Sequence, residues 1–170
     1  MNSADLLVDA FGRVRAAVHE VVVDSLTPPQ LTFRLDSQAN TIAWLVWHLS
    51  RVQDDHIADA AQAEQVWTSR GWAQRFGLPF HSRATGWGHT ADEVAAVQVD
   101  SAELLTAYYD AVHEQTIRYV RGLKDSDLDR IVDESWDPPV SLGARLVSVI
   151  ADDLEHAGQA ALIRGILARR

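Results

Sequence analysis

The chain has 170 residues, 47% of them hydrophobic, and a net charge of −9 at neutral pH. This length and composition are typical of one globular domain, and we expect it to span residues 1–170. The acidic balance argues against nucleic acid as a partner, because nucleic-acid-binding proteins normally present a basic face. The absence of cysteine excludes disulfide bonds, thiolate metal ligands and a cysteine nucleophile.

The N-terminal residues carry neither the basic flank nor the apolar core of a signal peptide. No uncharged apolar stretch is long enough to cross a membrane. We therefore expect a cytoplasmic protein that does not use a membrane as a partner.

A first amphipathic helix is predicted over residues 3–24. Apolar side chains recur there at helical spacing, with Ser3 as the expected N-cap and Pro28-Pro29 beyond its end. A second helix is predicted over residues 37–64, with Ile42, Leu45 and Leu49 on its apolar stripe.

The stretch 66–89 has a different composition. It combines large aromatic side chains with glycine and proline, which predicts a long aromatic-rich connection with at most one helical turn. Loops of this length in compact domains are more often functional than idle. Its tryptophans are interpreted first as packing that plugs the open end of the fold or forms a dimer face.

The C-terminal half continues the helical pattern. The capping-box sequence from Thr90 to Glu93 predicts a short helix to about residue 97. A third long helix is expected from about residue 100 to Gly122, then a single turn over 125–130 and an extended segment over 131–136. Ser141 is the expected N-cap of a fourth long helix over 142–167. No strand alternation predicts a sheet, so the expected fold is an all-α four-helix bundle with crossover connections.

Asp152 and His156 are the first candidates for chemistry. They are four residues apart in the last helix and therefore share one face of it. Carboxylate and imidazole at this spacing are usable metal ligands, although a solvated ion pair is the alternative reading. The pair shares a stripe with Val149 and Ile163, so it is expected to face inward, where a carboxylate needs a partner.

The second helix offers a third donor. His48 lies between Leu45 and Val52 on the inward stripe, and its alternative reading is a core histidine bonded to a backbone carbonyl. Asp55 and His56 follow about two turns later and are candidates to support a ligand or touch substrate; the alternative is that they are simple surface residues near the helix end. Two imidazoles and a carboxylate suit zinc, nickel, iron or manganese, and they leave coordination positions open for catalysis.

The sequence resembles the DinB-like metalloprotein superfamily. The resemblance lies in the run from Asn40 to Leu49 around His48, and in the later motif Asp152-x-x-x-His156-x-Gly158-Gln159 that ends in Arg164. It implies a four-helix bundle with a metal, most simply zinc or nickel, held by His48, Asp152 and His156. Most relatives have histidine in place of Asp152, whereas the mycothiol-dependent maleylpyruvate isomerases resemble this chain in having a carboxylate there.

The resemblance also implies an activity. Relatives of known function are transferases and isomerases that use a low-molecular-weight thiol such as mycothiol or bacillithiol against an electrophile. Metal activation of a thiol fits this chemistry, and the lack of cysteine agrees with a nucleophile supplied by the cosubstrate. The Ala-, Arg- and Val-rich composition favours mycothiol among these thiols, and the resemblance implies a homodimer.

Further residues are weighed as helpers. Tyr109 is a core residue or a hydroxyl lining the site, and Arg83 is a candidate to meet a carboxylate of substrate or thiol. Arg164 is expected to pair with a carboxylate near the helix end.

Two other functions stay open. One is a non-catalytic, stress-related or ligand-binding DinB-like dimer with a vestigial metal site. The other is a metal-dependent hydrolase with Asp55 or Glu155 as base.

Overall fold

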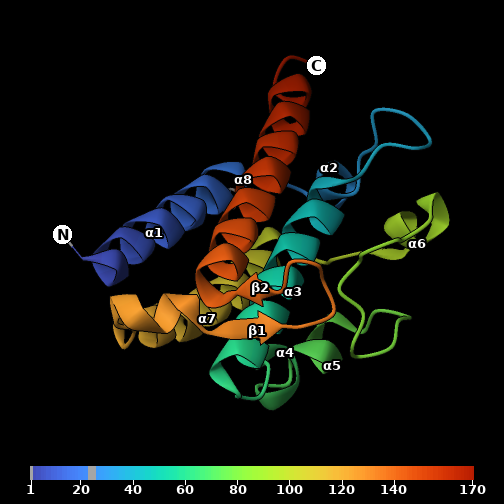
Figure 1. Ribbon diagram of the computed structural model, residues 1–170. Helices are drawn as coiled ribbons and strands as arrows, with labels where there is room; N and C mark the ends of the chain where they lie inside the picture. Colours follow the sequence, from blue (N-terminus) through green and yellow to red (C-terminus); the bar gives the residue numbers. More distant parts are fainter. Residues whose placement is uncertain (1, 23–25) are drawn as a thin grey trace.

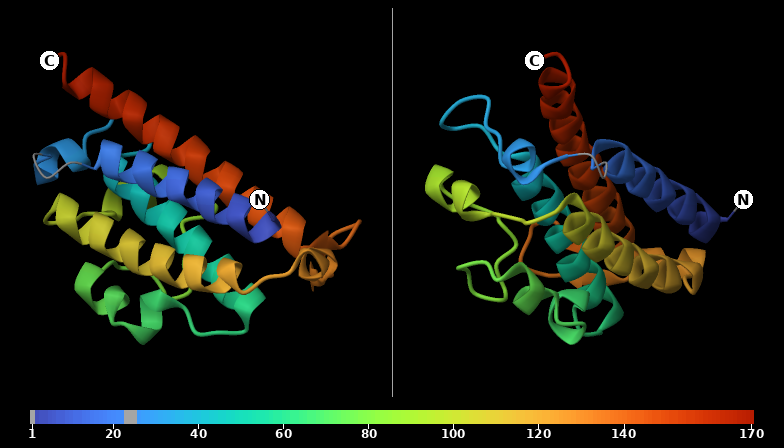
Figure 2. Two further views of the ribbon diagram at one scale, coloured as in Figure 1. Left: turned by 90° about the vertical axis from the view of Figure 1, so that its left-hand side faces the viewer. Right: turned by 180° about the vertical axis from the view of Figure 1, so that it is seen from behind.

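Four long helices dominate the computed structural model, which describes residues 2–22 and 26–170. They are α1 (Ser3–Val21), α3 (Ile42–Ala61), α7 (Ala102–Arg121) and α8 (Leu142–Leu167). Each of α1 and α3 packs against both α7 and α8, so the first two long helices occupy opposite corners of the bundle (Figures 1 and 2). The predicted all-α fold is confirmed.

Shorter elements connect the long helices. They are α2 (Pro28–Leu31), α4 (Val66–Ser69), α5 (Trp72–Phe76), α6 (Ala91–Ala96), the 3-10 helix η1 (Asp125–Asp129), and the strands β1 (Ile131–Asp133) and β2 (Val140–Ser141). The expected turn over 125–130, the short helix after Thr90 and the start of α8 at Ser141 are all observed.

The first helix differs from its prediction at both ends. Its N-cap is Asn2, because the Asn2 side chain accepts from the backbone N–H of Asp5 while Asp5 bonds back to Asn2; Ser3 is already helical. The helix ends at Val21. The predicted end at Asp24 lies outside the described residues.

The second long helix is shorter than predicted at both ends. Thr41 caps it by accepting from the N–H of Trp44, and the preceding turn is held by the Asp36 carboxylate. At the other end Gln62 adopts the left-handed conformation, with φ of 51°, which stops the helix.

The aromatic connection contains two short helices where one turn at most was predicted. Trp67 and Trp72 are buried there, and both rings pack near Tyr108 of α7. The expectation that tryptophans plug the bundle holds for these two. Trp87, in contrast, is 88% exposed.

The prediction that the chain forms no sheet is wrong for one short hairpin. β1 and β2 pair antiparallel, with Ile131 opposite Ser141 and Asp133 opposite Val140. The strands are too short to show alternation, which is why the pattern was missed. In Figure 1 the hairpin lies at the start of α8, on the side where the segment between α5 and α6 also runs.

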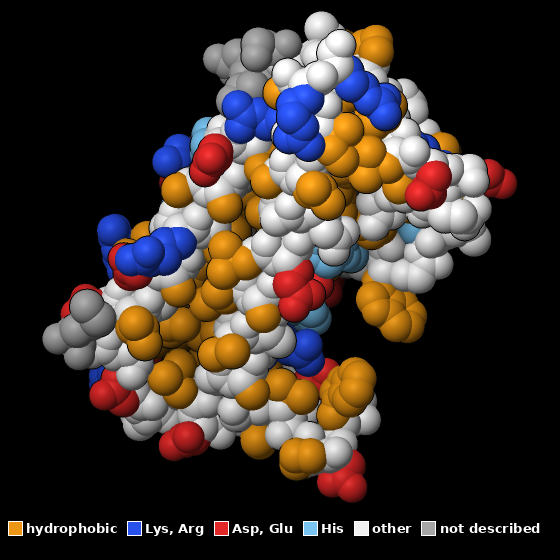
Figure 3. Space-filling model, turned by 90° about the horizontal axis from the view of Figure 1, so that it is seen from above, with side chains coloured by type: hydrophobic (Ala, Val, Ile, Leu, Met, Phe, Trp, Pro, Cys, Tyr) orange, Lys and Arg blue, Asp and Glu red, His pale blue; other side chains and the backbone are white. Residues whose placement is uncertain are grey.

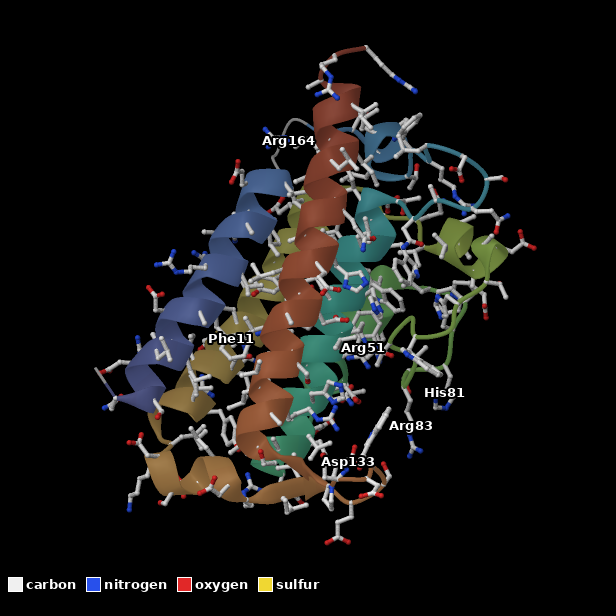
Figure 4. All side chains as sticks on the ribbon, turned by 45° about the horizontal axis from the view of Figure 1, so that its top comes forward. Phe11, Arg51, His81, Arg83, Asp133 and Arg164 are labelled. Atoms are coloured by element: carbon white, nitrogen blue, oxygen red, sulfur yellow. The ribbon has the colours of Figure 1, made fainter. Side chains whose placement is uncertain are left out.

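Arg164 ties α8 to the end of α1. Its guanidinium donates to the backbone carbonyl of Glu20, so the expected carboxylate partner is wrong (Figure 4). Among the described residues, no helix is long and apolar enough to cross a membrane.

Candidate metal centre and its cavity

His48, Asp152 and His156 converge between α3 and α8. One donor atom from each of these residues lies within 4.8 Å of the other two. The packing of α3 against α8 produces this arrangement, since His48 faces α8 while Asp152 and His156 follow each other on one face of α8. The structure therefore brings together the three residues that the sequence singled out.

Both imidazole rings are oriented by backbone carbonyl groups. His48 Nδ1 lies 2.6 Å from the carbonyl oxygen of Thr85, and His156 Nδ1 lies 2.7 Å from that of Asp152. A carbonyl oxygen only accepts, so each Nδ1 carries the proton and each Nε2 keeps its lone pair. This is how histidine ligands of metals are commonly held.

The electrostatics keep His48 neutral. Burial lowers its pKa, and this effect outweighs the hydrogen bond to Thr85, which raises the pKa. The His48 ring also stacks on Trp44, with ring centroids 4.5 Å apart and planes inclined by 14°. A neutral ring in a fixed orientation is the form that binds a cation.

Asp152 contributes a carboxylate that lacks a partner. Its Oδ2 atom is shielded from solvent and has no hydrogen bond within the described part of the chain. It lies 3.5 Å from His156 Nδ1, which is longer than the usual donor–acceptor distance of a hydrogen bond. A carboxylate oxygen without a partner, beside two imidazole nitrogens, fits a divalent cation, because its interaction with the ion would offset the free energy of burying the oxygen.

Gly86 allows the loop to approach His48. Its φ of +96° lies in a region that side chains rarely adopt. A Cβ atom at this position would stand 2.8 Å from His48 Nδ1 and 3.0 Å from the Trp47 ring. Only glycine permits the contact that delivers the Thr85 carbonyl to His48.

Arg51 fixes the same loop from inside the bundle. Its side chain is fully buried on α3 and donates to the carbonyl of Ala84 at 3.1 Å and to Gln65 Oε1 at 2.8 Å. Figure 4 shows Arg51 inside the fold, whereas His81 and Arg83 extend from the loop. Arg51 therefore holds the backbone next to Thr85 in place.

Asp54 is the counter-ion of Arg51 and closes this buried network. It lies 3.5 Å from the Arg51 guanidinium and accepts from the Tyr108 hydroxyl at 2.9 Å and from the N–H groups of Val66 and Trp67. Burial raises the Asp54 pKa, and these donors oppose the shift. The network connects α3, α4, α7 and the loop that orients His48.

A cavity of about 370 Å³ opens beside the candidate ligands. It is lined by His48, Val52, Asp55, His56, Thr85, Trp87, Asp133, Trp136, Arg145 and Asp152. Figure 3 shows a hollow in which histidine, acidic and basic side chains gather, with hydrophobic side chains on its rim. The arrangement places an open space for a small molecule against His48 and Asp152, two of the three candidate donors.

Asp55 and His56, two of the suggested helpers, both line this cavity. Asp55 Oδ1 accepts from the Gln65 amide at 2.6 Å, which connects it to the Arg51 network. His56 is half-buried, and its pKa is lowered, first by burial and then by the positive charge of Arg145. It is therefore a neutral base facing the cavity.

The other two suggested helpers lie elsewhere. Tyr109 is buried in the bundle, with its pKa raised well above the usual range by burial and then by Asp153. Arg83 is exposed on the loop. Neither residue is among those that line the cavity.

Sequence reasoning missed a second set of cavity residues: Trp87, Asp133, Trp136 and Arg145. Arg145 could have been found, because it precedes Asp152 by seven residues and so falls on the same face of α8. The hairpin residues gave no such signal, since their position depends on a turn that periodicity does not reveal.

Residues 6–168, nearly the whole chain, match the mycothiol-S-transferase family. The chain belongs to this family. The family is DinB-like, so the resemblance seen in the sequence is confirmed. No curated protein matches the chain.

Among solved structures, this family member is similar to a crystal structure described as the conserved protein of a locus from Enterococcus faecalis. The two are 28% identical and superpose with a TM-score of 0.91, over 100% of this chain and 99% of the other. The fold of the whole chain thus has a counterpart of similar shape.

Proposed function

We propose that this chain is a metal-dependent S-transferase that joins a low-molecular-weight thiol, mycothiol, to an electrophile. In this proposal His48, Asp152 and His156 hold a divalent ion, zinc or nickel. The observation that carries it is the convergence of two oriented imidazoles and an orphaned carboxylate beside an open cavity, which His48 and Asp152 line. The family match supports the thiol and the type of reaction.

The donor set leaves room for a cosubstrate. Three protein ligands without thiolate are typical of catalytic sites, in which a further position is open. When bound, such an ion lowers the pKa of a thiol and stabilises the thiolate that acts as nucleophile. The chain has no cysteine, so the sulfur must come from the cosubstrate.

His56 is suited to accept the thiol proton. It lines the cavity, and its lowered pKa leaves a ring nitrogen unprotonated at neutral pH. General-base catalysis of this kind typically contributes about 10²–10⁴-fold to a rate. The thiolate sulfur would then form the new C–S bond as the leaving group departs from the electrophile with the bonding electron pair.

The direct test is an S-conjugation assay. Zinc- or nickel-loaded protein is mixed with mycothiol and a haloaromatic or bromobimane electrophile, and the thioether is quantified by mass spectrometry. The proposal predicts conjugation well above the uncatalysed rate and its loss in the His156→Ala variant. Metal-loaded protein that gives only the uncatalysed rate would overturn it and favour the non-catalytic DinB-like alternative.

A further inference from the structure

Two segments outside the four long helices contribute tryptophans to the cavity. Trp136 comes from the β1–β2 hairpin and Trp87 from the loop that orients His48. Trp136 is 65% exposed and Trp87 is 88% exposed. Two large indole rings at one cavity are thus exposed to water, and a ligand that covered them would be stabilised by burial of their apolar surface.

A fixed polar pair lines the same cavity. Arg145 donates to Asp133 Oδ2 at 2.6 Å, and the two side chains are only 17% and 26% exposed. Asp133 Oδ1 is held in turn by the N–H and hydroxyl of Ser135. Arg145 uses one terminal nitrogen on Asp133, so other guanidinium N–H groups remain to donate to a ligand.

The charges of the cavity select against anions. Asp55, Asp133 and Asp152 face a single guanidinium, Arg145. Apart from Asp152 and an ion bound beside it, the charged lining residues are Asp55, Asp133 and Arg145, which together carry more negative than positive charge. A ligand carrying carboxylates or phosphates would be repelled from these residues.

Hydroxyl groups suit the same residues. A hydroxyl both donates and accepts, so it can donate to a carboxylate while it accepts from a guanidinium. The flat C–H face of a saturated ring can lie against an indole. Indole surfaces combined with a carboxylate–guanidinium pair therefore match an uncharged, hydroxyl-rich ring better than an apolar or an acidic group.

We propose that Trp87, Trp136, Asp133 and Arg145 form a subsite for an uncharged polyhydroxylated ring, the part of the thiol cosubstrate that does not react. The subsite selects a glycoside-type thiol over thiols that carry carboxylates. This inference rests on the proposed function for the identity of the cosubstrate. The subsite itself uses none of the three candidate metal ligands, so it can be tested separately.

The test uses blocked thiols, which cannot form a thiolate. Binding of S-methyl mycothiol and of S-methyl glutathione to the whole protein is measured by calorimetry, with and without added zinc. S-methyl mycothiol is expected to bind in both conditions, at least tenfold more tightly than S-methyl glutathione. Trp136→Ala and Arg145→Met are each expected to weaken its binding about tenfold, corresponding to about 1.4 kcal/mol.

Val147→Ala is the matched control, because Val147 is an exposed residue of the same helix and does not line the cavity. It should leave binding unchanged. If Arg145→Met unfolds the protein, Asp133→Asn tests the same pair, and circular dichroism establishes folding for each variant.

Three results would overturn the subsite: no binding of S-methyl mycothiol, unchanged binding in all folded variants, or equal affinity for S-methyl glutathione. An apolar haloaromatic that displaces S-methyl mycothiol, and that no longer binds the Trp136→Ala variant, would show that the indoles bind the electrophile. That result also contradicts the proposal. A failed conjugation assay with intact, selective binding would overturn the proposed function alone.

Discussion

His48 Nδ1 lies 2.6 Å from the carbonyl oxygen of Thr85, which is 37 residues further along the chain. This single contact sets the tautomer of His48 and aims its Nε2 atom at the two α8 donors. It depends on the path of the loop through Gly86 and on the buried Arg51 behind the loop. The candidate metal centre is thus shaped by residues that contribute no donor atom to it.

Gly86→Ala tests the approach of the loop. The added Cβ would clash with the His48 ring, so we expect zinc affinity to fall by at least about tenfold, as for other groups that orient metal ligands. Competition with a chromophoric chelator measures this affinity. Gly88→Ala is the matched control, because Gly88 has a similar φ of +74° and open space around its Cβ position. Equal losses in the two variants would contradict the role of Gly86.

Arg51→Met tests the buried network. The substitution leaves the Asp54 carboxylate buried without its counter-ion, so the free energy of unfolding should fall by about 3–5 kcal/mol. Urea denaturation followed by circular dichroism measures it. Arg13→Met breaks an exposed ion pair with Asp9 and should leave the free energy of unfolding almost unchanged. A loss in Arg51→Met no larger than in Arg13→Met would show that the buried network does not stabilise the fold.

The sequence predicted the fold class well because the long helices carry clear apolar periodicity. It also predicted that His48, Asp152 and His156 lie together, since helical spacing places Asp152 beside His156 and puts His48 on an inward stripe; their role as metal ligands stays a prediction. Helix ends were less predictable, because Asn2 and Thr41 act through single side-chain hydrogen bonds.

Part of the site could not be predicted from periodicity. The cavity wall depends on a two-residue pairing in a hairpin and on a loop held by Arg51, and both are tertiary contacts. Tyr109 and Arg83 were proposed as helpers because tyrosine and arginine suit such chemistry. Residue type alone does not reveal that Tyr109 faces the core and that Arg83 lies out on the loop.

His113 on α7 predicts a pH dependence of stability. Burial lowers its pKa below the usual 6.5, with Arg15 adding to the shift and Asp110 opposing it. Below pH 6.5 the unfolded chain therefore binds more protons at this residue than the folded one, and stability falls as the pH drops from 6.5 to the folded pKa. Urea denaturation between pH 7.5 and 5 should show a smaller decline in His113→Gln than in the unaltered protein. Identical slopes would contradict the shift.

Asp152→Asn tests the carboxylate ligand. The amide is uncharged and a weaker donor, so zinc affinity should fall by at least about tenfold. Glu155→Gln removes the same charge from an exposed position on the same helix and should leave the affinity unchanged. Equal affinity in Asp152→Asn and the unaltered protein would show that the carboxylate takes no part in binding.

The most direct test of the metal centre is the metal content of the purified protein, measured by elemental mass spectrometry after dialysis against zinc or nickel. We expect about one ion per chain in the unaltered protein. We expect loss of that ion in His156→Ala, with the helical circular dichroism spectrum retained. A protein that takes up neither metal, or a His156→Ala variant that keeps one ion per chain, would show that His48, Asp152 and His156 do not form a metal site.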